Sequence, residues 1–263
     1  MALQSLQLSD DGGCFILPWP PASPPLAEAL RDYFATHRSY FNDIIRLNEP
    51  APASAMPLSR WRQPAILASL IAAYGDHIYR NQPHQSREHK PLKSLWAQWY
   101  IGLLVPPLMM ALLTQRKALS LAPERIYVDF HETGRAASFW INAEEDVQLS
   151  SLAPRQRVEK LIADVLIPVV DALEASGDIN GKLIWSNTGY LVNWFLGELK
   201  PLLKDETHAL LINACFFEKQ LSCGQNNPLY RTVIPREGVL VRRTCCQRYK
   251  LPDVQSCGDC TLK

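Results

Sequence analysis

The sequence predicts an α+β fold in which several helices pack with an antiparallel sheet made of hairpins. Three observations support this fold class. Long segments carry apolar residues at helical spacing, and two pairs of β-prone runs are each joined by a short turn. The composition, with 47% apolar and 20% charged residues, is that of an ordinary soluble protein. At 263 residues the chain is long enough to bury a substantial core.

The first elements are predicted to be helices. The segment before Leu26 is rich in proline and is expected to have no regular structure. Residues 26–45 have apolar side chains at helical spacing, and residues 63–80 begin with a proline where a helix tolerates one. We therefore expect two helices joined by an irregular segment.

An uncharged apolar stretch from Ser94 to Gln115 is about as long as a membrane span, which needs ~20 residues. Pro106 and Pro107 stand at its middle, and each proline inside a helix costs on the order of 3 kcal/mol. Basic residues flank the stretch on both sides, so they indicate no orientation in a membrane. We expect two core helices that meet at the prolines.

Helices and strands alternate in the rest of the chain. Residues 125–130 and 135–142 predict a hairpin with Gly134 in its turn, and residues 154–176 predict a helix interrupted near Pro168. The elements expected after these are a short strand at 182–187, helices at 188–203 and 206–221, and a second hairpin at 230–243 around a proline and glycine turn.

Four of the seven cysteines follow this last hairpin, as Cys245, Cys246, Cys257 and Cys260. The two-residue spacing of the last pair brings both sulfurs to one metal centre. Adjacent cysteines point to opposite faces of a strand, so both reach one site only where the backbone bends. This pair fits a tetrahedral zinc site poorly, whereas a [2Fe–2S] cluster accepts less regular spacing. A cluster, structural zinc and a thiol–disulfide role all stay open.

Charge and location bear on this choice. The N-terminus lacks the pattern of a secretory signal, so we expect a cytoplasmic protein whose thiols are kept reduced. The net charge of +1 gives no field that attracts nucleic acid. Arg242, Arg243 and Arg248 flank the motif, and we expect them to offset the negative charge of a thiolate cluster or to guide an acidic donor protein. A solvated hairpin face explains the same arginines.

The segment RRTCCQRYKLPDVQSCGDC resembles the C-terminal signature of the FhuF-type ferric-siderophore reductases. Upstream segments are similar to an enterobacterial member of that family in order and spacing, namely NEPAPASAMPLSRW, YGDHIYRNQP, LWAQWYIGLLVPPLMMALLTQ, FHETGR and GKLIWSNTGYLVNWFL. The resemblance implies that Cys245, Cys246, Cys257 and Cys260 hold a [2Fe–2S] cluster. It also implies that the substrate is an iron-loaded hydroxamate siderophore delivered to the cytoplasm.

The reaction that this resemblance implies is one-electron reduction of the bound iron. Hydroxamate oxygens hold Fe(III) more firmly than Fe(II), so one added electron loosens the complex. We expect a ferredoxin- or flavin-type electron donor and no catalytic acid or base. Candidates for siderophore binding are Lys182, Trp185, Asn187, His131 and Glu132, although a strand with a core tryptophan and a turn explain the same residues.

Two alternatives remain for the function and the location of the protein. A zinc-stabilised binding module without redox activity is the second functional hypothesis, and a peripheral contact with the inner membrane stays open. We divide the chain into a main reductase domain at residues 1–229 and a hairpin with the cysteine motif at residues 230–263. We expect the two to pack as one compact unit.

Overall fold

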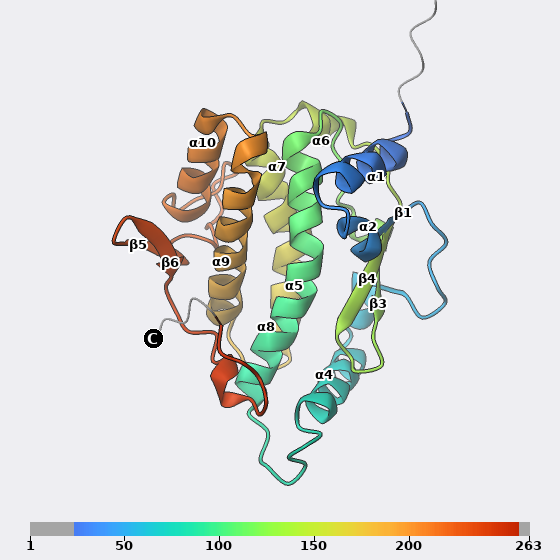
Figure 1. Ribbon diagram of the computed structural model, residues 1–263, viewed down its shortest axis with the longest axis vertical. Coiled ribbons are helices and arrows are strands. Elements are labelled where there is room, and N and C mark those ends of the chain that lie inside the picture. Colours follow the sequence, from blue (N-terminus) through green and yellow to red (C-terminus); the bar gives the residue numbers. More distant parts are fainter. Residues whose placement is uncertain (1–23, 258–263) are drawn as a thin grey trace, which may run out of the picture.

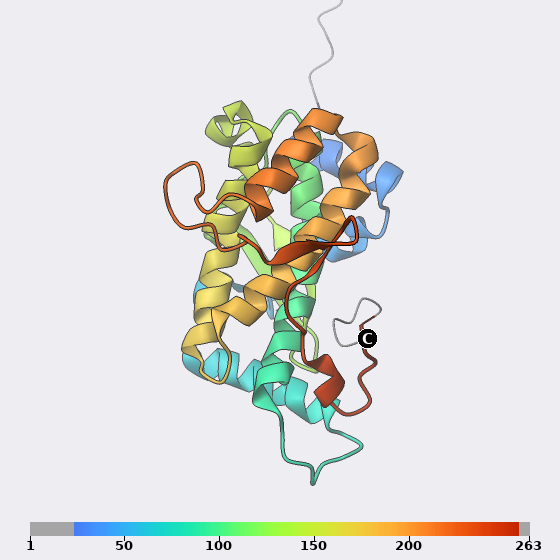
Figure 2. The same ribbon diagram turned by 90° about the vertical axis from the view of Figure 1, so that its left-hand side faces the viewer.

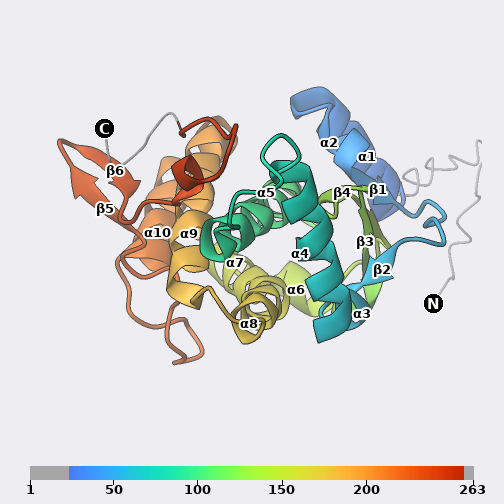
Figure 3. The same cartoon turned by 90° about the horizontal axis from the view of Figure 1, so that it is seen from below.

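A computed structural model describes residues 24–257 of the chain, so the predicted irregular N-terminal segment lies mostly outside the described residues. The longer helices surround α5 (His89–Thr114), which runs through the centre of the molecule (Figures 1 and 3). The other helices are α1 (Leu26–His37), α2 (Phe41–Ile44), α3 (Leu58–Trp61), α4 (Pro64–Ile78), α6 (Val147–Ser151), α7 (Pro154–Leu161), α8 (Ile167–Ala175), α9 (Gly181–Leu199) and α10 (Asp205–Phe216). Short strands form two separate sheets, so the α+β prediction is confirmed.

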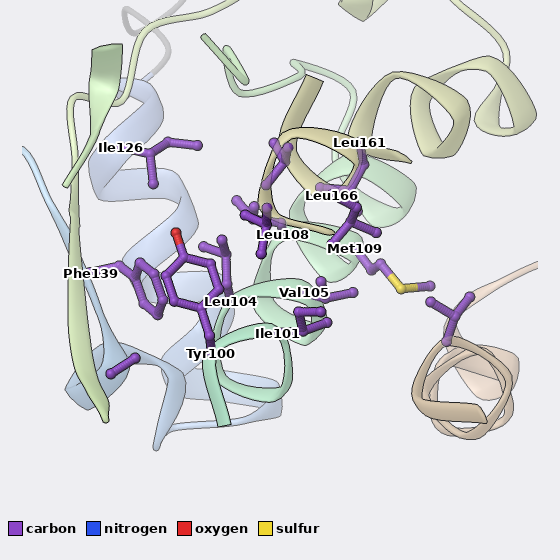
Figure 4. Close-up of a cluster of buried hydrophobic side chains, with 14 of the residues drawn as sticks. Tyr100, Ile101, Leu104, Val105, Leu108, Met109, Ile126, Phe139, Leu161 and Leu166 are labelled. Carbon is purple, nitrogen blue, oxygen red and sulfur yellow. The ribbon is translucent and has the colours of Figure 1, made fainter. Parts of the chain in front are cut away.

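The central helix corrects one prediction, because α5 continues through Pro106 and Pro107 instead of ending there. Both prolines are buried, and so are most of the side chains around them. Tyr100 and Leu104 point toward the sheet, whereas Met109 lies on the side of α7 (Figure 4). Full burial of a large apolar side chain contributes about 1.5–3 kcal/mol, so burial on both faces outweighs the cost of two prolines.

Helix α5 also has the length and composition of a membrane span, because it has 26 residues and its most apolar 18-residue window has a mean hydropathy of 1.4. In the fold, 67% of its most apolar window is buried inside the protein. Its apolar character is therefore used in packing against α4, α7, α9 and strand β4.

The first sheet has the order β1-β4-β3-β2 and lies on one side of α5 (Figure 1). Its strands are β1 (Ile45–Leu47), β2 (Met56–Pro57), β3 (Ile126–Phe130) and β4 (Ala136–Ile141). The β3–β4 hairpin confirms the prediction, and β1 joins it parallel to β4. The single helix predicted over residues 26–45 is wrong, because α1 ends at His37 and Ile45 already begins β1.

Two structural reasons require glycine at position 134 in the β3–β4 turn. Its φ of +77° lies in the left-handed region, which glycine adopts without strain. A Cβ at this position would lie 2.1 Å from the carbonyl oxygen of Leu70 in α4. The Gly134 carbonyl also accepts a hydrogen bond from Trp96 Nε1 at 2.8 Å, so the turn is held against α4 and α5 together.

The helix predicted over residues 154–176 is confirmed, and its interruption is a π-helical segment at Ile162–Leu166, just before Pro168. The strand predicted at 182–187 is wrong, because these residues form the start of α9. Asn180 caps this helix, since its side-chain oxygen accepts a hydrogen bond from the backbone N–H of Leu183 at 3.1 Å. A short apolar run fits a buried helix as well as a strand, and burial against α5 selects the helix.

The second hairpin is confirmed as β5 (Val233–Arg236) and β6 (Val239–Arg242), which pair antiparallel. Its turn is Glu237-Gly238, both at positive φ, while Pro235 lies within β5. Figure 2 shows the hairpin lying across α9, after which the chain descends to the lower end of α5. The division of the chain at residues 229 and 230 stays a prediction.

Candidate metal centre

Polar side chains, three of them buried, attach the cysteine motif to α5 and α9. Ser94 on α5 donates through Oγ to the backbone carbonyl of Cys246 at 3.1 Å. Asn187 on α9 donates through Nδ2 to Ser94 Oγ at 2.9 Å, and Thr244 bonds through its hydroxyl to Ser186 at 2.7 Å. Because polar groups are buried at a cost unless they are paired, these bonds specify one position for the motif.

Among residues 24–257, the structure brings together the predicted ligands Cys246 and Cys257. The Sγ atoms of Cys246 and Cys257 lie 3.9 Å apart, well beyond the ~2.05 Å of a disulfide bond. Cys246 is only 1% exposed, and Cys257 is half-buried. The two thiols are therefore placed to bind one shared centre without being bonded to each other.

The adjacent cysteine pair lies between two bends of the backbone. Arg243 and Thr244 form a bend before it, and Gln247 after it adopts a left-handed conformation with φ of +63°. The backbone N–H of Gln247 donates a hydrogen bond to Cys245 Sγ at 3.3 Å. The bends are the feature that a vicinal pair needs if both sulfurs are to serve one site.

The remaining ligand, Cys260, lies outside the described residues. Within residues 24–257, no three metal-binding side chains are arranged around a common point. The donor chemistry nevertheless fits a [2Fe–2S] cluster. It offers neighbouring reduced thiols, a backbone N–H directed at sulfur, and positive charge beside them.

The positive charge comes from two of the three predicted arginines. Arg242 is 5% exposed, donates to Asn187 Oδ1 at 3.3 Å, and stacks on the Tyr190 ring with 4.3 Å between its Cζ and the ring centroid. The Nε atoms of Arg242 and Arg248 are buried and have no hydrogen-bond partner in the described part of the chain. Arg243 is exposed instead.

Arg242, Arg248 and Cys257 line one cavity of about 240 Å³ between α5 and α9. Neither arginine forms an ion pair with any carboxylate in residues 24–257. Arg242 is buried and Arg248 is partly buried. Burying a cation without a carboxylate partner is costly, and a negative group in the cavity would reduce that cost. The cavity is therefore electrostatically suited to an anionic centre.

A larger cavity of about 630 Å³ lies beside the first, and Gln98 and Arg248 line both. Its other lining residues come from α4, from α5, from the turn before β4 and from the segment before Cys257: Tyr74, His77, Ile78, Leu95, Trp99, Arg135, Asp253, Val254 and Gln255. Burial raises the pKa of Tyr74 to about 12. Burial, and then the positive charges of Arg80 and Arg135, lower the pKa of His77.

The predicted siderophore-binding residues do not form one group. Asn187 lines the smaller cavity, whereas Lys182 is exposed on α9 and Trp185 packs against the core. His131 and Glu132 are exposed in the β3–β4 turn. None of these last four is among the residues that line either cavity.

Sequence reasoning did not find Ser94, Trp99 or Arg135. Ser94 and Trp99 belong to a stretch whose apolar character was its most visible property, and Arg135 follows a turn glycine. These three residues can be recognised as part of the site only from the fold, which places α5 and the β3–β4 hairpin beside the C-terminal segment.

Comparison with known proteins shows the family of the chain. A family model described as ferric iron reductase FhuF-like transporter matches residues 94–240. A second, described as FhuF 2Fe-2S C-terminal domain, matches residues 242–262 and so includes all four predicted ligands. The chain is 61% identical over 243 residues to the ferric siderophore reductase of Escherichia coli (strain K12). These aligned residues cover 92% of this chain and 93% of that protein.

Proposed function

This chain belongs to the FhuF-like ferric iron reductases that carry a 2Fe–2S C-terminal domain, and from that premise we propose the details of its activity. It is a ferric-siderophore reductase, and its substrates are Fe(III) complexes of hydroxamate-type siderophores. Cys245, Cys246, Cys257 and Cys260 are the cluster ligands, and the iron leaves as Fe(II) in the cytoplasm.

One observation carries this proposal. The thiols of Cys246 and Cys257 lie 3.9 Å apart, and Cys257 lines a cavity together with two arginines that have no carboxylate partner among the described residues. A [2Fe–2S] cluster with four thiolates carries a net charge of about −2, or about −3 when reduced, and nearby cations offset it. A zinc site with four thiolates would also carry about −2, so the adjacent cysteine pair, rather than the charge, disfavours structural zinc.

When bound, a [2Fe–2S] cluster supplies a one-electron carrier. The protein's own residues hold and shield it. Ser94 and Asn187 fix the backbone of Cys246, whose near-complete burial excludes water. Arg242 and Arg248 favour the more negative state and so raise the reduction potential. The reaction needs no catalytic acid or base, because electron transfer alone weakens the hold of hydroxamate oxygens on iron.

The electron donor is proposed to be a ferredoxin- or flavin-type protein with an acidic surface. Arg236, Arg243 and Lys250 are exposed on the C-terminal hairpin and on the segment after it, close in sequence to the cysteines. Complementary charge raises the association rate of two proteins more than it raises their affinity. A peripheral contact with the inner membrane stays a prediction. Helix α5, whose sequence suggested that contact, is mostly buried, so other residues would have to make it.

The test begins with purified protein handled without oxygen. We expect a reddish protein with iron and sulfide in equal amounts, whose visible absorption bleaches with dithionite and returns when a ferric hydroxamate is added. A chelator specific for Fe(II) should then measure one Fe(II) ion released for each electron that the reduced protein supplies. A colourless protein containing zinc would instead support the binding-module alternative.

A further inference from the structure

The larger cavity has the size of a ligand site. Its volume of about 630 Å³ falls within the ~300–1,000 Å³ of typical small-molecule sites, whereas the smaller cavity, at about 240 Å³, falls below that range. A third cavity, of about 600 Å³, lies between α4 and α8. Its described lining residues include none from the segment after β6, so size alone does not single out a site and position must decide.

The position of the larger cavity favours electron transfer. Asp253, Val254 and Gln255 form part of its wall, and the chain reaches Cys257 two residues later. Arg248 lines this cavity and also the smaller one that contains Cys257. A molecule bound here would lie against the segment that carries a proposed cluster ligand. Because electron transfer slows steeply with distance, this proximity matters for the reaction.

The lining suits a hydroxamate complex. Trp99 is 40% exposed and carries the Arg135 guanidinium over its ring, with 4.7 Å between Cζ and the ring centroid. Ile78, Leu95 and Val254 add apolar surface for the methylene arms of such a ligand. Asp253 is the acidic residue of the wall, and it accepts a hydrogen bond from Asn81 Nδ2 at 2.9 Å.

The cavity also favours the negative charge that reduction adds to the bound iron complex. Three hydroxamates around Fe(III) are neutral in sum, and one added electron leaves a charge of −1. Arg135 and Arg248 would stabilise the reduced complex more than the oxidised one, which is the differential binding that accelerates a reaction. The lowered pKa of His77, caused by burial and then by Arg80 and Arg135, is consistent with a positive field there.

We propose that the ferric siderophore binds in this cavity, with Trp99 and Arg135 as contacts and Arg248 between the substrate and the cysteine motif. The proposal rests on the proposed function and adds its substrate site. A [2Fe–2S] cluster held by the four cysteines would supply the single electron that converts the bound Fe(III) to Fe(II), and the ferredoxin- or flavin-type donor would replace that electron. No bond to the protein forms or breaks.

Binding can be tested apart from turnover with gallium(III) ferrichrome, an uncharged tris-hydroxamate complex that accepts no electron under these conditions. Its Kd for the oxidised, cluster-containing protein is measured by calorimetry. We expect Trp99→Ala and Arg135→Gln each to weaken binding about tenfold. Trp99→Phe should retain most of the affinity, because it keeps an aromatic face. Arg62→Gln, in the third cavity, is the matched control and should leave Kd unchanged.

The outcomes separate this proposal from the proposed function. If both variants bind the gallium complex as tightly as the wild type, or if the wild type does not bind it at all, the site assignment is wrong. Iron content and the reduction potential of the variants should match the wild type, which excludes a general structural defect. If the wild type binds the gallium complex here but no ferric hydroxamate reoxidises the reduced protein, the proposed function fails while the binding site stands.

Discussion

The contact between α9 and the C-terminal hairpin depends on Gly189. A Cβ added at this position would lie 2.0 Å from Thr232 Oγ1 and 2.6 Å from Thr232 Cβ. Thr232 immediately precedes β5, and its hydroxyl donates a hydrogen bond to the Leu229 carbonyl at 2.7 Å, so it cannot move away without losing that bond. Replacing Gly189 with alanine should therefore displace the hairpin from α9.

The magnitude follows from two opposing effects. Overpacking a well-packed contact costs typically 1–3 kcal/mol. Gly197 provides the control, because it is exposed in the same helix and an added Cβ would meet nothing within 4 Å. Gly197→Ala should stabilise the protein by about 0.5–1 kcal/mol through helix propensity alone. Gly189→Ala gains the same propensity, so the two variants should differ by the overpacking cost alone, roughly 1–3 kcal/mol, or about 2–12 °C in apparent Tm.

Thermal unfolding followed by circular dichroism measures this difference, and iron content per chain measures its effect on the site. Because the hairpin leads directly to the cysteine motif, we expect Gly189→Ala to lose iron and Gly197→Ala to retain it. If Gly189→Ala is as stable as Gly197→Ala and equally rich in iron, the close contact with Thr232 does not hold the hairpin, and this reasoning fails.

Three further predictions concern the arginines and the cysteines. Arg242→Met should lower the reduction potential of the cluster by on the order of 60 mV, because it removes a buried cation. Arg243→Met, which changes an exposed residue, should alter the potential little. An anaerobic redox titration compares the two variants, and equal potentials would contradict the role of Arg242. Cys246→Ser should abolish iron binding, whereas Cys215→Ser should not. Burial raises the pKa of Cys215 to about 12, so iodoacetamide at pH 8 should alkylate exposed Cys223 and spare Cys215 in the folded protein, as mass spectrometry can show.

Local patterns were sufficient for the hairpins and for most helices. A turn glycine between two β-prone runs predicted β3 and β4, and a proline at a helix start predicted α4. The failures occurred where burial outweighs local preference. Pro106 and Pro107 argued for a break in α5, and the run at 182–187 argued for a strand, yet both segments are helical because each lies in the packed centre.

The candidate site divides in the same way. The sequence by itself determined the four cysteines and the nearby arginines, since ligand type and spacing are local properties of the chain. Only the tertiary structure decided that Arg242 and Arg248 face a cavity while Arg243 faces solvent, because direction after a bend depends on what the segment packs against. The joining of Ser94, Trp99, Arg135 and Asn187 to that segment likewise required the fold. Residues so far apart in the sequence meet only when α5, α9 and the β3–β4 hairpin pack together.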